Sequence, residues 1–385
     1  ARYLLEDPVR PGLLYLGTEN TLYVSFDDGD NWQSFMTNLP STPMYGLWVQ
    51  EHFNDLVVGT YGRGFWILDD LSPLQQLTDE VVASDAHLFE PRSAYRFQSR
   101  TRAQSMPNDP SAGRNPPSGA AINYWLGSQP SDSVWIHIFD ASGRRVRTFD
   151  GSRLVGINRV WWNFRDDPQG QVRMRTKPLY ADWVDLGDDG WRSGGGGISL
   201  MMPPGRYTVT LEVGGQSMSQ QFEILKDPNS DGSLEDIKAQ LAFVSEVRDD
   251  YVEAARLVNR VEWVRRQMYD MKPVFEDQDG FDDIIAAADA LDSELIEVEQ
   301  KLVRMTTTGT GQDGVRYPTM VAGRLRYLAG AAGTADFQPT DQMGEVHQVL
   351  AAQLREYSAE LEPLLGGRLQ EFNAMLQAKG IRPVF

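Results

Sequence analysis

The chain has 385 residues, 41% hydrophobic and 10% aromatic, which is enough for several packed domains of about 100–200 residues each. Its net charge of −18 argues against a nucleic-acid partner, because phosphate binding needs a basic face. The absence of cysteine excludes disulfides, thiolate metal sites and cysteine nucleophiles. No apolar run approaches the ~20 residues of a transmembrane segment. Because the chain begins at Ala1 without Met or a signal peptide, we expect an internal or processed start or the boundary of an expressed fragment.

Residues 1–78 contain short runs rich in large apolar residues, each bounded by Gly, Asn, Asp or Pro. The runs are Leu13–Thr18, Thr21–Phe26, Trp32–Met36, Met44–Gln50, Asp55–Tyr61 and Gly64–Leu68. Their spacing predicts meander sheets, and with roughly four strands per blade they amount to about one and a half blades of a β-propeller. Such a piece cannot close a ring and would leave broad apolar edges. We therefore expect the remaining blades to come from an upstream part of a longer chain or from another subunit.

A motif of the form Ser/Thr-x-Asp-x-Gly-x-x-Trp lies between the second and third of these runs. Its fixed positions are Ser25, Asp27, Gly29 and Trp32. The pattern predicts a tight turn, because Asp can bond the backbone two residues on and Gly can adopt a positive φ. Asp27, Asp28 and Asp30 could also be read as acid/base carboxylates, but glycosidases place two carboxyls across a cleft ~5–10 Å apart. We therefore interpret the motif as structural.

This motif resembles the Asp-box of the bacterial neuraminidase repeat. Together with Gly12–Asn20, Asn38–Pro40 and Leu56–Asp70, it resembles the last blades of a bacterial family of sortilin-like, BNR (Asp-box) repeat proteins that are often labelled glycosyl hydrolases. The resemblance covers essentially the whole chain and is most specific in residues 1–78. It implies a multi-bladed propeller, a β-sandwich and a helical tail, in an extracellular or periplasmic protein. The glycosidase label of that family comes mostly from the repeat, so we do not carry it over.

Arg63 lies between two glycines in a predicted strand turn. It could belong to a ligand or partner surface, as an anion-binding side chain. The alternative, which we favour, is an ion pair with Asp69 or Asp70.

Residues 79–226 predict an immunoglobulin- or fibronectin-like β-sandwich, because short strands alternate with turn signals. The expected strands are Ile122–Leu126, Val134–Phe139, Arg145–Phe149, Asn158–Phe164, Arg206–Val213 and Ser217–Leu225. Ser99–Gly119 is rich in Pro, Ser, Asn and Arg and reads as a connection.

A long Gly/Asp-rich insertion at 165–197 interrupts these strands, with Trp183 and Trp191 among several aspartates. A long loop with exposed aromatic residues can be a binding surface for a sugar or a partner protein. The alternative, which we favour, is that both tryptophans pack back on the sandwich.

Residues 227–385 predict an antiparallel helical bundle. The segment starts with Asp227, Asn229 and Asp231, which match the first half of an EF-hand calcium loop. The twelfth position, where a bidentate Glu is needed, holds Lys238. We therefore expect a linker in which Ser233 caps the next helix, and calcium-dependent adhesion remains only a third hypothesis for function.

Apolar residues at three- and four-residue spacing predict helices over the rest of the segment. The helices are Leu234–Met271, Asp282–Met305, Pro318–Ala329 and Asp341–Ala378. We expect Pro363 with Gly366 and Gly367 to kink or split the last helix. The four histidines lie in separate regions without metal-ligand spacing, and we expect no cofactor.

The sequence therefore favours a non-catalytic, exported scaffold or binding protein that acts through protein–protein contacts in a larger assembly. The alternative is the accessory C-terminal region of a glycoside- or peptide-acting hydrolase whose active site lies on missing propeller blades. We assign no catalytic residue to this segment.

Overall fold

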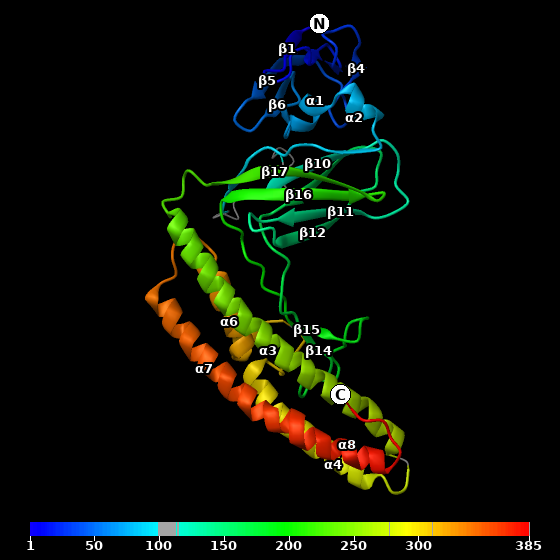
Figure 1. Ribbon diagram of the computed structural model, residues 1–385, viewed down its shortest axis with the longest axis vertical. Helices are drawn as coiled ribbons and strands as arrows, with labels where there is room; N and C mark the ends of the chain where they lie inside the picture. Colours follow the sequence, from blue (N-terminus) through cyan, green and yellow to red (C-terminus); the bar gives the residue numbers. More distant parts are fainter. Residues whose placement is uncertain (99–112, 114, 277, 310, 385) are drawn as a thin grey trace. The chain divides into compact units, whose positions relative to one another are not determined.

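The computed structural model describes residues 1–98, 113, 115–276, 278–309 and 311–384 (Figure 1). The protein combines β-sheets with a C-terminal helical region, which confirms the mixed β and α class expected from the sequence. It divides into two compact units, one formed by residues 1–165 and 204–227 and the other by residues 166–203 and 228–385. The inserted segment is therefore part of the helical unit. Most of the predicted connection Ser99–Gly119 lies outside the described residues.

The first unit begins with a four-stranded and a three-stranded antiparallel sheet. The strands are β1 (Tyr3–Glu6), β2 (Leu14–Gly17), β3 (Leu22–Ser25), β4 (Gln33–Ser34), β5 (Met44–Gln50), β6 (Asp55–Thr60) and β7 (Phe65–Leu68). Each of the predicted runs contains one of strands β2 to β7. Strand β1 was not predicted, because its side chains stay largely exposed and show no alternation between buried and exposed positions.

The two sheets share one hydrophobic core. It is made of Leu13, Tyr15, Leu22, Val24, Met44, Leu47, Val49, Leu56, Val58 and Leu71. The sheets approach closely at Gly17, because a Cβ atom on it would lie 2.9 Å from Met44 Cβ. The backbone of β2 at Gly17 therefore packs directly against Met44 of β5.

Two further sheets follow in the same unit, after the short helices α1 (Ser72–Gln76) and α2 (Asp79–Ala83). One sheet has the order β13-β10-β8 and the other β12-β11-β16-β17-β9. The strands are β8 (Ala86–Leu88), β9 (Ala94–Arg96), β10 (Ala120–Leu126), β11 (Val134–Phe139), β12 (Arg145–Gly151), β13 (Gly156–Trp162), β16 (Gly205–Val213) and β17 (Gln216–Lys226). Only β8 and β9 were not predicted; they have three residues each, too short for a periodic pattern.

Trp162 at the end of β13 joins these two sheets. It is fully buried, and its ring packs edge-to-face against Tyr207 of β16 at 5.1 Å and Phe222 of β17 at 6.0 Å between centroids. Its indole Nε1 donates a hydrogen bond to the Arg165 carbonyl at 2.9 Å, so the polar atom of the ring is satisfied.

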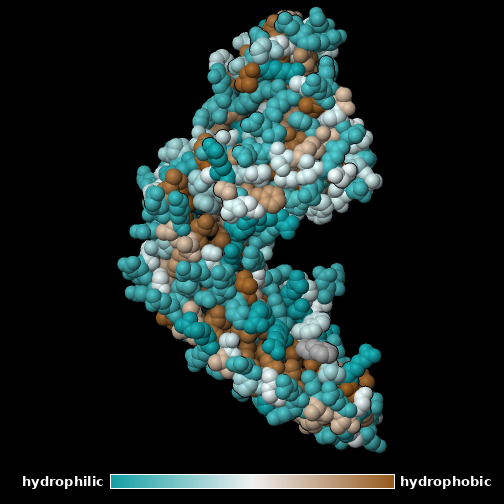
Figure 2. Space-filling view, viewed as in Figure 1, coloured by the Kyte–Doolittle hydropathy of each residue, from teal (hydrophilic) through white to brown (hydrophobic). Residues whose placement is uncertain are grey.

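The helical unit contains the hairpin of β14 (Val172–Met174) and β15 (Arg192–Gly195), which packs on α3. Its helices are α3 (Leu234–Phe275), α4 (Asp282–Leu302), α5 (Asp313–Arg316), α6 (Val321–Ala332), α7 (Asp341–Pro363), the π-helical turn η2 (Leu364–Arg368) and α8 (Leu369–Ala378). Figure 2 shows the visible face of these helices to be largely hydrophilic, with apolar residues gathered between the helices.

The predicted ends and interruptions of the helices are confirmed at two places. Ser233 caps α3 in a capping box with Asp236, where each side chain bonds the backbone N–H of the other residue. The π-helical turn begins directly after Pro363 and contains Gly366 and Gly367. Among the described residues, no helix is both long and apolar enough to cross a bilayer.

We predict that Trp162→Ala lowers the free energy of unfolding of the first unit by about 3–5 kcal/mol, because it leaves a large cavity between two sheets. Trp161, its neighbour on β13, is only partly buried and stacks with the Arg159 guanidinium at 5.7 Å. Trp161→Ala is therefore the matched control, with a clearly smaller loss. Urea unfolding monitored by circular dichroism measures both, and equal losses would contradict the role given to Trp162.

Candidate protein-binding face

The outward side of the β5–β7 sheet exposes large apolar side chains to solvent. Trp48 on β5 is 63% exposed, Phe65 on β7 is 83% exposed, and Tyr61 in the β6–β7 connection is 69% exposed. Tyr45 and Ile67 are also exposed. We call these five residues the aromatic face.

The register of the strands explains how the aromatic face forms. Trp48, Val57 and Ile67 lie opposite one another across the three strands, and so do Gly46, Gly59 and Phe65. The glycines leave open space, and the Phe65 ring lies over Gly59, 3.7 Å from where a Cβ atom would be. The intervening positions, such as Leu47 and Val58, point into the core.

A bulge adds one more aromatic ring to this side of the sheet. The register shifts between Met44 and Gly46, so Tyr45 is left without a partner in the ladder. Its side chain is exposed, and its ring lies 5.6 Å from that of Tyr61. Contiguous exposed aromatic residues are typical of protein-binding surfaces, since Trp and Tyr bury much apolar area at low entropic cost. The face therefore suits an apolar partner surface.

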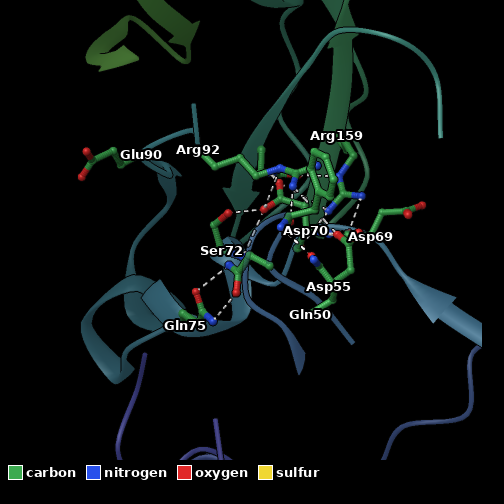
Figure 3. A network of polar contacts seen from close by, with 12 residues as sticks. Gln50, Asp55, Asp69, Asp70, Ser72, Gln75, Glu90, Arg92 and Arg159 are labelled. Carbon is green, nitrogen blue, oxygen red and sulfur yellow. Dashed lines mark hydrogen bonds and ion pairs between the residues drawn. The ribbon is translucent and has the colours of Figure 1, made fainter. Parts of the chain in front are cut away.

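A buried polar cluster holds the end of β7 in place (Figure 3). Its centre is Asp70, whose side chain is fully buried. Asn123 Nδ2 on β10 donates to Asp70 Oδ2 at 2.9 Å, and the Ser72 backbone N–H donates to Oδ1 at 3.2 Å. Arg92 Nε lies 3.8 Å and Arg159 Nη2 lies 3.9 Å from the two carboxylate oxygens. Figure 3 shows both guanidinium groups directed toward Asp70.

Arg159 of β13 also binds the backbone in this cluster. It donates to the carbonyl oxygens of Asp69 at 3.0 Å and Asp70 at 3.2 Å, and its Nε donates to Asn123 Oδ1 at 2.7 Å. Burial disfavours the charged form of both groups. It therefore lowers the pKa of Arg159 and raises the pKa of Asp69. Asp70 has a φ of 61°, a left-handed conformation that Asp tolerates. The cluster thus attaches the sheet that carries the aromatic face to the β13-β10-β8 sheet.

The prediction that Arg63 forms an ion pair with Asp69 or Asp70 is wrong. Among the described residues, Asp70 has its ion pairs with Arg92 and Arg159. Arg63 is exposed beside the aromatic face, and its carbonyl oxygen accepts a hydrogen bond from Trp66 Nε1 at 3.1 Å.

The Asp-box residues form a self-contained turn. Asp27 accepts hydrogen bonds from Ser25 Oγ at 2.8 Å and from the backbone and side chain of Asn31 at 2.8 and 2.7 Å. The side-chain bond from Asn31 is the main cause that lowers the pKa of Asp27. Gly29 has a φ of 92°, and Trp32 lies 3.5 Å from where its Cβ atom would be. A carboxylate whose oxygens accept hydrogen bonds from residues of the same turn is not arranged for acid/base catalysis.

Trp183 and Trp191 belong to the helical unit, and their contacts lie within it. Trp183 is exposed, and its Nε1 donates to the Thr308 carbonyl at 3.3 Å. Trp191 is half-buried under the Arg173 guanidinium, 5.2 Å from its ring centre. The two tryptophans thus contact the inserted segment and the residues after α4.

The calcium candidates are arranged as a linker before α3. Asp227 is the last residue of the first unit, and Asn229 and Asp231 are exposed at the start of the second. Within the part of the chain that the structure describes, no group of three or more acidic or histidine side chains is placed to hold a metal ion.

Comparison of the chain with protein-family models and with curated proteins gives no match.

Sequence reasoning missed both the aromatic face and the cluster that supports it. The run Gly64–Leu68 is apolar at successive positions, which is typical of a strand covered on both sides, and this signal could have indicated the face. Asp70, Asn123 and Arg159 are far apart in the chain, and no local pattern connects them.

We predict that Asp70→Asn destabilises the first unit by about 2–4 kcal/mol, because two partly buried guanidinium groups lose the fully buried carboxylate that contacts both of them. Asn keeps the size of the side chain and also tolerates a positive φ, so the substitution removes the charge together with one of the two acceptor oxygens. Asp28→Asn is the control, since Asp28 has a φ of 57° but is exposed. Urea unfolding of both variants tests this, and a loss no larger than that of the control would contradict it.

We predict that excess EDTA leaves the melting temperature unchanged, because the loop at Asp227–Asp231 lacks a bidentate ligand at Lys238. Differential scanning calorimetry with EDTA or added calcium checks this. A calcium-dependent rise in melting temperature that Asp231→Asn abolishes would contradict it.

Proposed function

We propose that this chain is a non-catalytic scaffold or binding module of an exported protein, and that its first two sheets are blades of an Asp-box β-propeller. The aromatic face carries this proposal. We infer that its occupant is a further antiparallel blade, from an upstream part of a longer chain or from another subunit.

The packing of the two sheets supports a blade-like arrangement. Sheet β1–β4 has the four strands typical of a blade, and its core is shared with the inner side of the β5–β7 sheet. The other side of β5–β7 carries the exposed aromatic face. In a propeller each blade is covered by neighbours on both sides, so an uncovered apolar side is expected where the next blade is supplied from elsewhere.

The rest of the chain fits the same proposal. The paired sheets around Trp162 consist mostly of antiparallel strands, as in an immunoglobulin- or fibronectin-like sandwich, with β9 added parallel to β17. The helices α3, α4, α6 and α7 pack on one another as a bundle would. Both would be accessory parts that extend the contact surface of the assembly.

The alternative is an accessory region of a glycoside- or peptide-acting hydrolase. It requires two carboxyls across a cleft or a group of arginines on further blades. In the described part of the first unit, Asp27 and Asp70 are occupied by structural hydrogen bonds. Paired carboxylates in the sequence upstream of Ala1 in the source polypeptide would favour this alternative.

Site-specific photo-crosslinking tests the proposed occupant. We predict that benzoylphenylalanine in place of Phe65, introduced in the cells that make the protein, forms an adduct with a β-rich segment that carries Asp-box repeats. Tyr327 on α6 is 78% exposed and is the control position. Mass spectrometry of the adduct, with the intact mass of the source polypeptide, distinguishes the same longer chain from a second subunit. The absence of an adduct at Phe65, or identical adducts at Tyr327, would overturn the proposal.

A further inference from the structure

Two fully buried glutamates meet between α3 and α4 in the helical unit. Glu262 of α3 and Glu299 of α4 both have no exposed surface. They share Arg265 of α3, whose Nη1 lies 3.2 Å from Glu262 Oε1 and 2.9 Å from Glu299 Oε2. Two carboxyl groups this deeply buried beside one guanidinium cannot both ionise at low cost.

The hydrogen bonds of Glu262 are those of an ionised carboxylate. Its Oε2 accepts from the backbone N–H groups of Arg175 and of Thr176, the latter at 2.6 Å. Its Oε1 accepts from Thr176 Oγ1 at 2.8 Å and from Arg265. Both oxygens are thus occupied by donors, several of them from the segment that follows β14.

Glu299 has a much poorer set of donors. Arg265 donates to its Oε2, while its Oε1 is buried and has no hydrogen-bond partner among the described residues. An unpartnered oxygen of a buried carboxylate is costly. Both carboxyl groups contact the same Arg265 Nη1 and lie within hydrogen-bonding reach of each other, so a proton on Glu299 would give the pair a hydrogen bond. Burial raises the pKa of Glu299 well above its ordinary value, and the charge of Glu262 raises it further.

Charged groups of the neighbouring elements also lie near the two glutamates. Asp292 of α4 lies 2.7 Å from Arg265 Nε. Arg192 of β15 is close enough that the charges of Glu262 and Glu299 oppose the lowering of its pKa that burial causes. Among the described residues, none of these groups donates a hydrogen bond to Glu299 Oε1.

The other charged groups near this junction have separate contacts. The positive charge of Arg304, just after α4, lowers the pKa of Arg192 further. Glu294 and Lys301 of α4 pair with Arg368 of η2 and Glu360 of α7, respectively. Lys301 is two residues from Glu299 and so points about 200° away around the helix. From α6, Arg324 donates to the Thr319 carbonyl, and Arg326 lies near Tyr251 of α3.

We propose that Glu299 is held as a neutral carboxylic acid that donates its proton to Glu262, and that this shared proton makes the junction of α3, α4 and the β14–β15 hairpin a pH-sensitive contact. When the pH rises, the proton leaves Glu299 for solvent, and two carboxylates then face each other with one guanidinium between them. The junction loosens, because the buried charge is relieved only if α4 moves away or water enters.

The sign of the effect follows from the direction of the shift. The pKa of Glu299 is raised in the folded protein above the 4.5 of an ordinary glutamate. Its contribution to stability is therefore complete below about pH 4.5 and is lost as the pH rises through the folded-state pKa. The stability of the helical unit should fall over that range.

The variant Glu299→Gln tests the inference, because glutamine keeps the shape and a neutral donor but cannot ionise. Melting temperatures are measured from about pH 5 to pH 8.5, with the exposed Glu297→Gln on the same helix as the control. We expect the melting temperature of the wild type and of Glu297→Gln to fall with rising pH, and that of Glu299→Gln to fall less and to lie above the wild type at the upper end. An unchanged slope in Glu299→Gln, or an equal loss at every pH, would overturn the inference.

Infrared spectroscopy reports the proton directly in the folded protein. We expect a carbonyl stretching band of a protonated carboxylic acid in the wild type at neutral pH, and the same band in Glu297→Gln. The band should be absent from Glu299→Gln. If the wild type has no such band at neutral pH, Glu299 is ionised and the inference fails, even if the glutamine variant is poorly folded.

Discussion

Large apolar side chains on a sheet favour coverage, because apolar surface left in water costs free energy. A contiguous exposed apolar patch therefore indicates a surface that another segment or protein covers. The β5–β7 sheet meets this constraint on its inner side, where Leu47 and Val58 join the shared core. On its outer side Trp48 and Phe65 remain in solvent. The proposal of a further blade follows from this asymmetry, and the buried cluster at Asp70 matters because it holds the same sheet against its neighbour.

Buried charge is handled differently in the two units. Asp70 in the first unit has guanidinium groups on two sides and hydrogen bonds from Asn123 and Ser72, so an ionised carboxylate is matched there. Glu299 in the helical unit shares a single guanidinium with a second buried carboxylate. The second arrangement favours the neutral form of Glu299. The helical unit is therefore the part of the chain in which we expect pH to act.

The candidate site was only partly accessible from the sequence. The strands that carry it were predicted, with β5 at the same residues, because their β-branched and aromatic residues alternate between punctuating glycines and polar residues. The sequence did not predict which side of each strand remains exposed. Trp48 and Leu47 are both apolar, and only the packing of a second sheet distinguishes them. The turn at Ser25–Trp32 was predicted from the sequence because its bonds connect residues a few positions apart.

The sequence by itself determined much of the local structure of this protein: the longer strands and helices, the cap at Ser233 and the interruption after Pro363. These depend on backbone preferences and on hydrogen bonds between residues a few positions apart. Only the tertiary structure decided that the insertion belongs to the helical unit, that Arg159 rather than Arg63 meets Asp70, and that Glu262 meets Glu299. Those contacts join residues that are distant in the chain. They form because buried charges need partners wherever packing brings them together, and no local pattern encodes that meeting.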